Sequence, residues 1–376
     1  MVINPGADVG DLAVGHVAVL DQIIPVGDLG AELNAFDGEP AGLRIYRLCR
    51  EEGITFRAVG DLQATAFMGR QLPQTLLALL REGADADGGI LHEPRDVLGL
   101  RYRTRESLYN QPTVLALDYA AAHLSGIVPV DDDQQTRNDI TATRTDGSSF
   151  RAAQASGPLS VAPPPAGVGS YDENVTLNLQ ADSQVPDAAG WLLYLGTIDE
   201  ARYPELKLDL ARAPFVANPA LAATVQQLNI GDRVTVANPP AWLPPDAITQ
   251  LAQGFTETLN AFTHRVDINC SPQRPWSQIA RYNDGVSRYS SDGSTLTADV
   301  SPSATSLSVA TVGTRLWTHD DGDFAIRVGG EVMTVTAVTG TTSPQTFTVV
   351  RSVNGVVKAQ PAGAEVALDH PVVYVR

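Results

Sequence analysis

The strongest constraint on the fold lies in the last part of the chain, Ser294–Val375, where branched and aromatic residues alternate with small polar ones. Within Glu331–Val338 every second side chain would lie on the same side, which is the geometry of a β-strand. Valine and threonine recur, and their branched side chains fit a pleated, half-buried surface. The pattern therefore predicts a small all-β module at residues 281–376.

Two dipeptides within this module predict hairpin turns. Gly329-Gly330 lies between two alternating segments, and Asn354-Gly355 lies between FTVVRSV and VVKA. Glycine adopts positive φ angles at little steric cost, and Asn-Gly is a strong short-range hairpin signal. We therefore expect a strand on each side of both dipeptides.

Three stretches of the chain resemble a known family. Trp317–Leu368 and Gly231–Pro275 closely resemble minor tail proteins of tailed phages that infect high-GC Gram-positive bacteria, and Phe36–Ile54 resembles them more loosely. The region from about residue 60 to 209 matches only in general pattern. The resemblance implies a tail-tip hub of β-barrel-like domains with an α/β lobe, usually closed into a threefold ring.

The remaining sequence suggests three further regions. Residues 36–130 favour an α/β hub lobe, and residues 131–280 favour a β-rich hub domain. Residues 1–35 hold one predicted strand, Ala13–Leu20, which cannot form a domain alone; the resemblance implies that it ends a preceding lectin-like domain. The expected fold is mainly β with an α/β lobe: β-barrel or β-sandwich domains, then the C-terminal module.

Proline, glycine and apolar spacing predict three helices. They span Pro40–Glu52, Pro73–Glu82 with Gly83 after its end, and Pro219–Leu228 with Asn218 as its cap. The segments predicted as strands in this part of the chain are ENVTLNLQ, GWLLYLG, LKLDL, DRVTVAN, FTETLN and HRVDINC. The tryptophans are expected in cores rather than on ligand platforms, Trp191 in an apolar segment and Trp242 folded back on the proline rings of its own loop.

Charge and composition narrow the classes of partner. The formal net charge of -17 argues against stable binding to nucleic acid or to an anionic membrane. Two interpretations stay open: a solvated acidic surface, or an acidic channel wall along which DNA passes without sticking.

No stretch approaches the roughly 20 apolar residues of a membrane span. Cys49 and Cys270 are widely separated and predict two buried free thiols in a protein made in a reducing cytoplasm.

The sequence displays no catalytic motif. No Gly-x-Ser-x-Gly elbow occurs, and His92-Glu93 is followed at once by Pro94, so the helical face of a zinc protease cannot form. The six histidines show no metal-ligand spacing. We therefore expect no cofactor and no enzymatic activity.

One acidic turn is a candidate metal site. His319-Asp320-Asp321-Gly322-Asp323 has the carboxylate density that Ca²⁺ requires, although the usual calcium-loop pattern is absent. The candidate ligands are Asp320, Asp321 and Asp323. A bound cation and a plain solvated turn both stay open.

These observations favour a structural protein of the virion tail. The resemblance implies a homotrimeric tail-tip hub, in contact with tail-tube, distal-tail and receptor-binding subunits and forming part of the ring through which DNA leaves. The alternative is a tail-associated cell-wall hydrolase or a carbohydrate-binding protein. An enzyme would need a carboxylate pair in a cleft or a metal triad, and neither is visible in the sequence.

Overall fold

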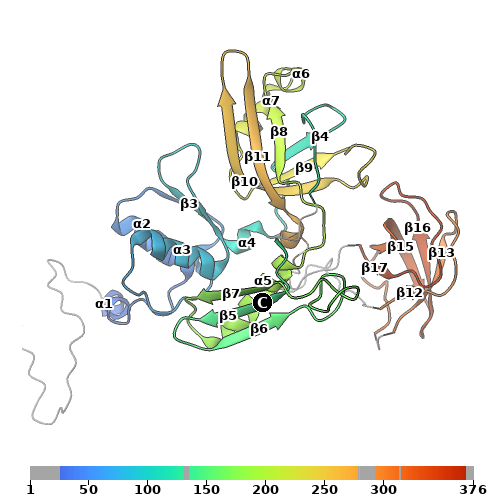
Figure 1. Ribbon diagram of the computed structural model, residues 1–376, viewed down its shortest axis with the longest axis horizontal. Coiled ribbons are helices and arrows are strands. Elements are labelled where there is room, and N and C mark those ends of the chain that lie inside the picture. Colours follow the sequence, from blue (N-terminus) through green and yellow to red (C-terminus); the bar gives the residue numbers. More distant parts are fainter. Residues whose placement is uncertain (1–25, 131–134, 278, 280–292, 313–314, 370–376) are drawn as a thin grey trace, which may run out of the picture.

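The computed structural model describes residues 26–130, 135–277, 279, 293–312 and 315–369. It has more strand than helix, with an α/β lobe, a half-barrel and a nearly closed six-stranded antiparallel barrel (Figure 1). The expected mainly β fold with an α/β lobe is therefore confirmed. The strand predicted for Ala13–Leu20 lies outside the described residues. Within the described ranges, no helix is long and apolar enough to cross a membrane.

The α/β lobe packs two of the predicted helices on a small sheet. Ile45, Leu80 and Tyr102 are buried together where α2, α3 and β3 meet. In the sheet, ordered β1-β3-β2, β3 runs parallel to β1 and antiparallel to β2. The elements are α1 (Val26–Leu33), α2 (Ala41–Glu51), β1 (Phe56–Val59), η1 (Leu62–Ala64), α3 (Leu76–Asp87), β2 (Ile90–His92), β3 (Leu100–Arg103) and α4 (Arg105–Leu108).

Helix α3 continues past the end predicted for it at Glu82. Gly83 is a packing residue rather than a cap, because a Cβ there would lie only 3.0 Å from Cγ1 of Ile45. The helix ends at Asp87, where Gly88 takes the left-handed conformation with a φ of 74°.

A three-stranded sheet ordered β6-β5-β7 shares a core with this lobe. Its elements are β5 (Asp139–Arg144), β6 (Ser149–Ala153), β7 (Asp172–Leu177), η3 (Asp182–Gln184) and α5 (Val185–Gly196). The segment GWLLYLG lies in α5, so its prediction as a strand is wrong. Pro186 suits a first helical turn, and Val185 and Ala189, four residues apart, are buried in the shared core. Trp191 is buried on this helix, as expected.

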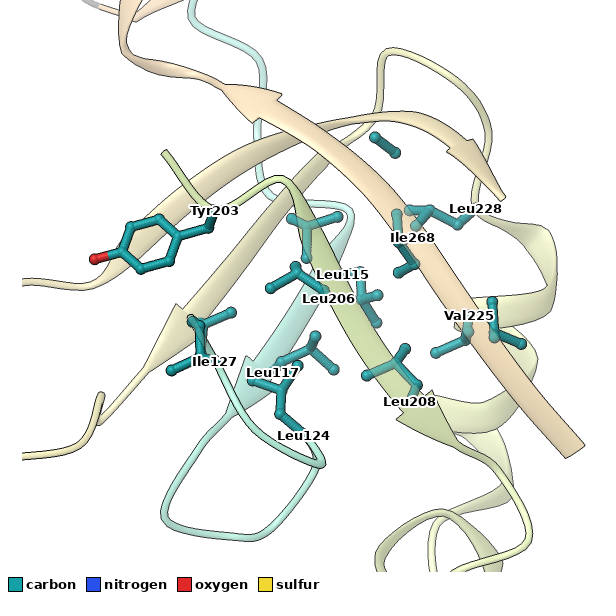
Figure 2. Packing of buried hydrophobic residues seen from close by; sticks show 14 of the residues in the cluster. Leu115, Leu117, Leu124, Ile127, Tyr203, Leu206, Leu208, Val225, Leu228 and Ile268 are labelled. Atoms are coloured by element: carbon teal, nitrogen blue, oxygen red, sulfur yellow. The ribbon is translucent and has the colours of Figure 1, made fainter. Parts of the chain in front are cut away.

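The half-barrel is a five-stranded sheet ordered β4-β9-β10-β11-β8. It curves around an apolar cluster in which Leu206 and Leu208 of β8 lie beside Ile268 of β11, and Val225 of α7 belongs to the same cluster (Figure 2). Asn218 caps α7 as predicted: its Oδ1 accepts a hydrogen bond from the Leu221 amide at 3.2 Å. The elements are β4 (Leu115–Asp118), β8 (Glu205–Asp209), α6 (Ala213–Val216), α7 (Pro219–Gln227), β9 (Arg233–Ala237), β10 (Ile248–Leu259), β11 (His264–Pro272) and η4 (Arg274–Trp276).

The C-terminal module is a six-stranded antiparallel barrel ordered β12-β13-β16-β15-β14-β17. A bridge between Thr295 and Glu365 brings its two end strands together. Trp317 and Phe347 are buried in its core. The strands are β12 (Thr295–Leu296), β13 (Ser306–Ala310), β14 (Phe324–Val328), β15 (Glu331–Thr339), β16 (Gln345–Val350) and β17 (Val366–Leu368).

The two predicted turns have different outcomes. Gly329 and Gly330 join β14 to β15 with positive φ angles of 54° and 88°, so this hairpin is confirmed. The strand predicted after Asn354-Gly355 does not form. The Asn354 side chain instead accepts a hydrogen bond from the Val332 amide at 3.0 Å and donates one to the Gly330 carbonyl at 3.0 Å. The turn therefore folds back onto the neighbouring hairpin instead of starting a strand.

A buried ion pair organises one end of the barrel. Arg351 donates from Nε and Nη2 to the two carboxylate oxygens of Glu331 at 2.7 Å each, and the Glu331 side chain is 0% exposed. The Gln360 amide donates to the same carboxylate at 3.0 Å. Burial alone would raise the pKa of Glu331, but these hydrogen bonds outweigh it and hold the pKa below its usual range.

The barrel contains its own core and should fold alone. We expect a fragment spanning Ser294–Arg376 to give a β-type circular dichroism spectrum and a cooperative thermal melt. A random-coil spectrum for the isolated fragment would contradict this expectation.

Replacing Glu331 with Gln should destabilise the barrel by about 3–5 kcal/mol, because it leaves Arg351 buried without its counter-charge. The pair's contribution is complete above the unfolded carboxyl pKa of about 4.3 and is lost as pH falls through the lower folded pKa. Denaturant unfolding of the fragment at several pH values measures both effects. Glu365→Gln, at an exposed position, is the control and should change stability by about 0.5 kcal/mol or less. A flat pH profile for the unsubstituted barrel would refute the role given to Glu331.

The turn glycines should differ in their tolerance of alanine. At Gly355 (φ 78°) a Cβ would meet nothing within 4 Å, so Gly355→Ala should cost only the left-handed strain of about 1–2 kcal/mol. At Gly329 a Cβ would lie 2.5 Å from Oε1 of Gln360, which belongs to the Glu331 network. We therefore expect Gly329→Ala to cost more than Gly355→Ala in urea unfolding, and equal costs would show that Gln360 moves freely.

Candidate interaction surfaces

The acidic turn is exposed and held by a side-chain pair. His319 Nε2 lies 3.0 Å from Asp323 Oδ1, and Asp320, Asp321 and Asp323 are all exposed. In the part of the chain that the structure describes, no three or more His, Cys, Asp or Glu side chains are grouped so that they could hold a metal ion. The cation therefore stays a prediction from the sequence.

The other singled-out groups lie apart and make local contacts. His92 is buried, and burial is the main reason that its pKa is lowered. His123 Nδ1 accepts a hydrogen bond from the Asp118 backbone amide at 3.0 Å.

The two cysteines are free thiols, Cys49 buried and Cys270 half-buried. Burial raises the pKa of both thiols, that of Cys270 to about 12. Protonated thiols are poor nucleophiles, so neither cysteine is set up for chemistry.

Trp242 does not lie in a core, so the expectation for this tryptophan is wrong. Its side chain is 63% exposed, whereas the next residue, Leu243, packs against the half-barrel core. Prolines before and after these two residues fix the backbone of the loop, so one side chain reaches the core and the other points to solvent. The same loop touches the C-terminal barrel, with Asp246 3.6 Å from Arg327.

The β10–β11 hairpin extends beyond the rest of its sheet (Figure 1). β9 pairs with β10 only over Ile248–Leu251, so Gly254–Leu259 pairs with β11 alone. The hairpin tip, Leu259–Thr263, exposes 71% of Leu259 and 90% of Phe262. Such exposure of large apolar side chains at one projecting turn is typical of an interaction surface.

Hydrogen bonds fix the backbone of the hairpin tip. The side-chain Oδ1 of Asn260 accepts hydrogen bonds from the backbone amides of Phe262 and Thr263, each at 2.9 Å. The backbone amide of Asn260 donates to the Thr263 carbonyl at 2.9 Å. An asparagine that accepts from amides further along the chain forms an Asx-type turn. Phe262 is therefore held outward by local structure.

Arg95 ties the β2–β3 connection to this hairpin. Its guanidinium donates to the Val225 carbonyl at 3.2 Å and to Glu257 Oε2 at 3.0 Å, and lies 4.6 Å from the ring centre of Phe255. His264 Nε2 lies 2.6 Å from the other carboxylate oxygen of Glu257. The α/β lobe and the hairpin are thus connected through one carboxylate.

An open pocket of about 770 Å³, here called the loop pocket, lies beside the same connection. It is lined by Gly53–Thr55 and Glu93–Leu100, and its apolar walls include Ile54 and Val97. Leu98 is 95% exposed. Asp96 at the pocket is 2.6 Å from Arg57.

The sequence did not single out either surface. The signal for the hairpin tip was available: Leu259 and Phe262 flank Asn260, a turn residue, within a short loop between two strands. The loop pocket had no such signal, since it depends on the contact between residues 53–55 and 93–100.

Comparison with known proteins finds partial structural similarity to tail proteins. No family model and no curated protein matches it. Among solved structures, the 43 kDa tail protein of prophage MuSo2 from Shewanella oneidensis is 13% identical over 65% of this chain and 67% of its own, with a TM-score of 0.42. A tail protein from Neisseria meningitidis MC58 is 10% identical over 65% of this chain and 71% of its own, with a TM-score of 0.45. Prophage tail protein gp18 from Listeria monocytogenes EGD-e is 11% identical over 58% of this chain and 60% of its own, with a TM-score of 0.33. The chain is thus structurally similar to prophage tail proteins.

Proposed function

We propose that this chain is a structural subunit of a phage tail tip, of the hub type found in minor tail proteins. Three copies form a ring that joins the tail tube to distal-tail and receptor-binding subunits and surrounds the path by which DNA leaves. The particle is assembled in the bacterial cytoplasm, with a high-GC Gram-positive host.

One observation carries this proposal. The two stretches that most closely resemble minor tail proteins each make up a coherent part of the fold. Gly231–Pro275 contains β9, β10 and β11, the three central strands of the half-barrel. Trp317–Leu368 contains β14, β15, β16 and β17 of the C-terminal barrel. A resemblance that covers neighbouring strands of one sheet supports a shared architecture more strongly than scattered words would.

The chemistry of three buried polar pairs supports a structural role. Arg351 neutralises Glu331, Arg103 neutralises Asp232, and Tyr102 donates its hydroxyl hydrogen to Asp87 at 2.6 Å. These partners satisfy one another inside the protein rather than facing a substrate. The acidic net charge supports a ring that lets DNA pass without retaining it.

The proposal makes a joint prediction about assembly and activity. Light scattering over a concentration series should show a trimer, because a tail tip must match the threefold symmetry that the resemblance implies. A zymogram on host cell walls should stay uncleared. A persistent monomer that clears the gel would contradict the proposal and favour the tail-associated hydrolase.

A further inference from the structure

We propose that the hairpin tip of one copy binds the loop pocket of the next copy, so that each chain contributes one protruding and one receiving surface to the ring. This inference rests on the homotrimer proposed above and names the contact that would hold it together. The partner is a second copy of this chain because both complementary surfaces belong to the same chain.

The hairpin tip is suited to enter a pocket. Phe262 is 90% exposed and Leu259 is 71% exposed, so both would lose contact with water on binding. The two hydrogen bonds to Asn260 Oδ1 hold the turn before binding, so little conformational freedom is lost in the complex. Buried aromatic anchors of this kind supply much of the energy of protein interfaces.

The loop pocket is suited to receive this tip. At about 770 Å³ it has room for a phenylalanine and a leucine side chain together. Ile54 and Val97 line it, and Leu98, 95% exposed, extends the apolar surface outward. Apolar contact on both sides would remove three of the most exposed large side chains from water.

Charge supports the same pairing. Arg265, one strand residue from the hairpin turn, is exposed, and Glu93 is exposed at the edge of the loop pocket. Neither side chain has an ion partner among the described residues. Two copies with a net charge of -17 repel one another, so a contact that brings Arg265 of one copy to Glu93 of the next is favoured over contacts without such a pair.

Arg95 fixes the spacing between the two surfaces within one chain. It lies in the pocket lining and also contacts Glu257 and Phe255 on the hairpin. Because the hairpin tip and the loop pocket keep a fixed distance and orientation within each chain, every pair of neighbouring copies can form the same contact. Heterologous contacts repeated in this way generate a closed ring when the rotation between neighbours closes.

Disulfide trapping tests the contact directly. One chain carrying Phe262→Cys is mixed with another carrying Leu98→Cys and oxidised. The native thiols are buried (Cys49) or half-buried (Cys270), and the unsubstituted protein is the blank that reports any reaction of theirs. On a non-reducing gel we expect a mixed dimer, in which the thiol introduced at the hairpin tip of one chain is joined to the thiol introduced at the loop pocket of the other. Val357→Cys, 61% exposed on the barrel, replaces Phe262→Cys in the control and should give no specific product. If the only product were a dimer of two Phe262→Cys chains, the proposal would be overturned in favour of a tip-to-tip contact.

Sedimentation of charged variants gives a second readout. Phe262→Asp and Leu98→Asp should each weaken self-association at least tenfold, whereas Val357→Asp should leave it unchanged. The series is run at 0.15 and 0.5 M salt, because screening reduces the repulsion between acidic copies. A trimer that survives both substitutions would overturn this inference and leave the proposed tail-tip ring intact. If the native protein stays monomeric and the two cysteine variants give no mixed disulfide, this inference is overturned and the ring is also disfavoured.

Discussion

The arrangement of the α/β lobe and the half-barrel depends on the buried contact between Arg103 and Asp232. Arg103 at the end of β3 donates to Asp232 Oδ1 at 2.5 Å and to the Gly231 carbonyl at 3.0 Å, and both ion-pair side chains are no more than 10% exposed. A third partner, Gln111, accepts a hydrogen bond from the same guanidinium through Oε1 at 3.2 Å. Since a charge left alone in this position would be costly, the two units are held in one relative orientation.

Arg103 and Arg95 connect two ends of the same small sheet to the half-barrel. β2 and β3 are antiparallel neighbours, and the connection between them carries Arg95 while β3 ends at Arg103. Both arginines reach the half-barrel, one at the start of β9 and one at the hairpin. The projecting hairpin and the loop pocket are therefore positioned by the same lobe, which is the physical basis for treating them as parts of one interface.

Local patterns predicted the elements well, and long-range contacts explain the errors. The Asn218 cap and the Gly329-Gly330 hairpin depend on neighbouring residues, and both are present in the structure. GWLLYLG is apolar enough for a strand or a helix, and its packing against β5 and β6, with Pro186 in the first turn, favours the helix. Gly83 carries the same local signal as a cap, but the proximity of α2 gives it another role. Arg95 and Glu257 are separated by 162 residues, so no local pattern could have paired them.

The closure of the C-terminal barrel has a consequence for how such a module can be transferred between proteins. β12 and β17 are antiparallel along the seam, where the Val366 amide donates to the Ser294 carbonyl at 2.9 Å. The chain therefore enters and leaves the barrel side by side, at the same end. A domain with adjacent ends can be spliced into a surface loop of another protein without stretching either fold. The positions of its two ends therefore make this barrel suitable for insertion into other proteins as a complete domain.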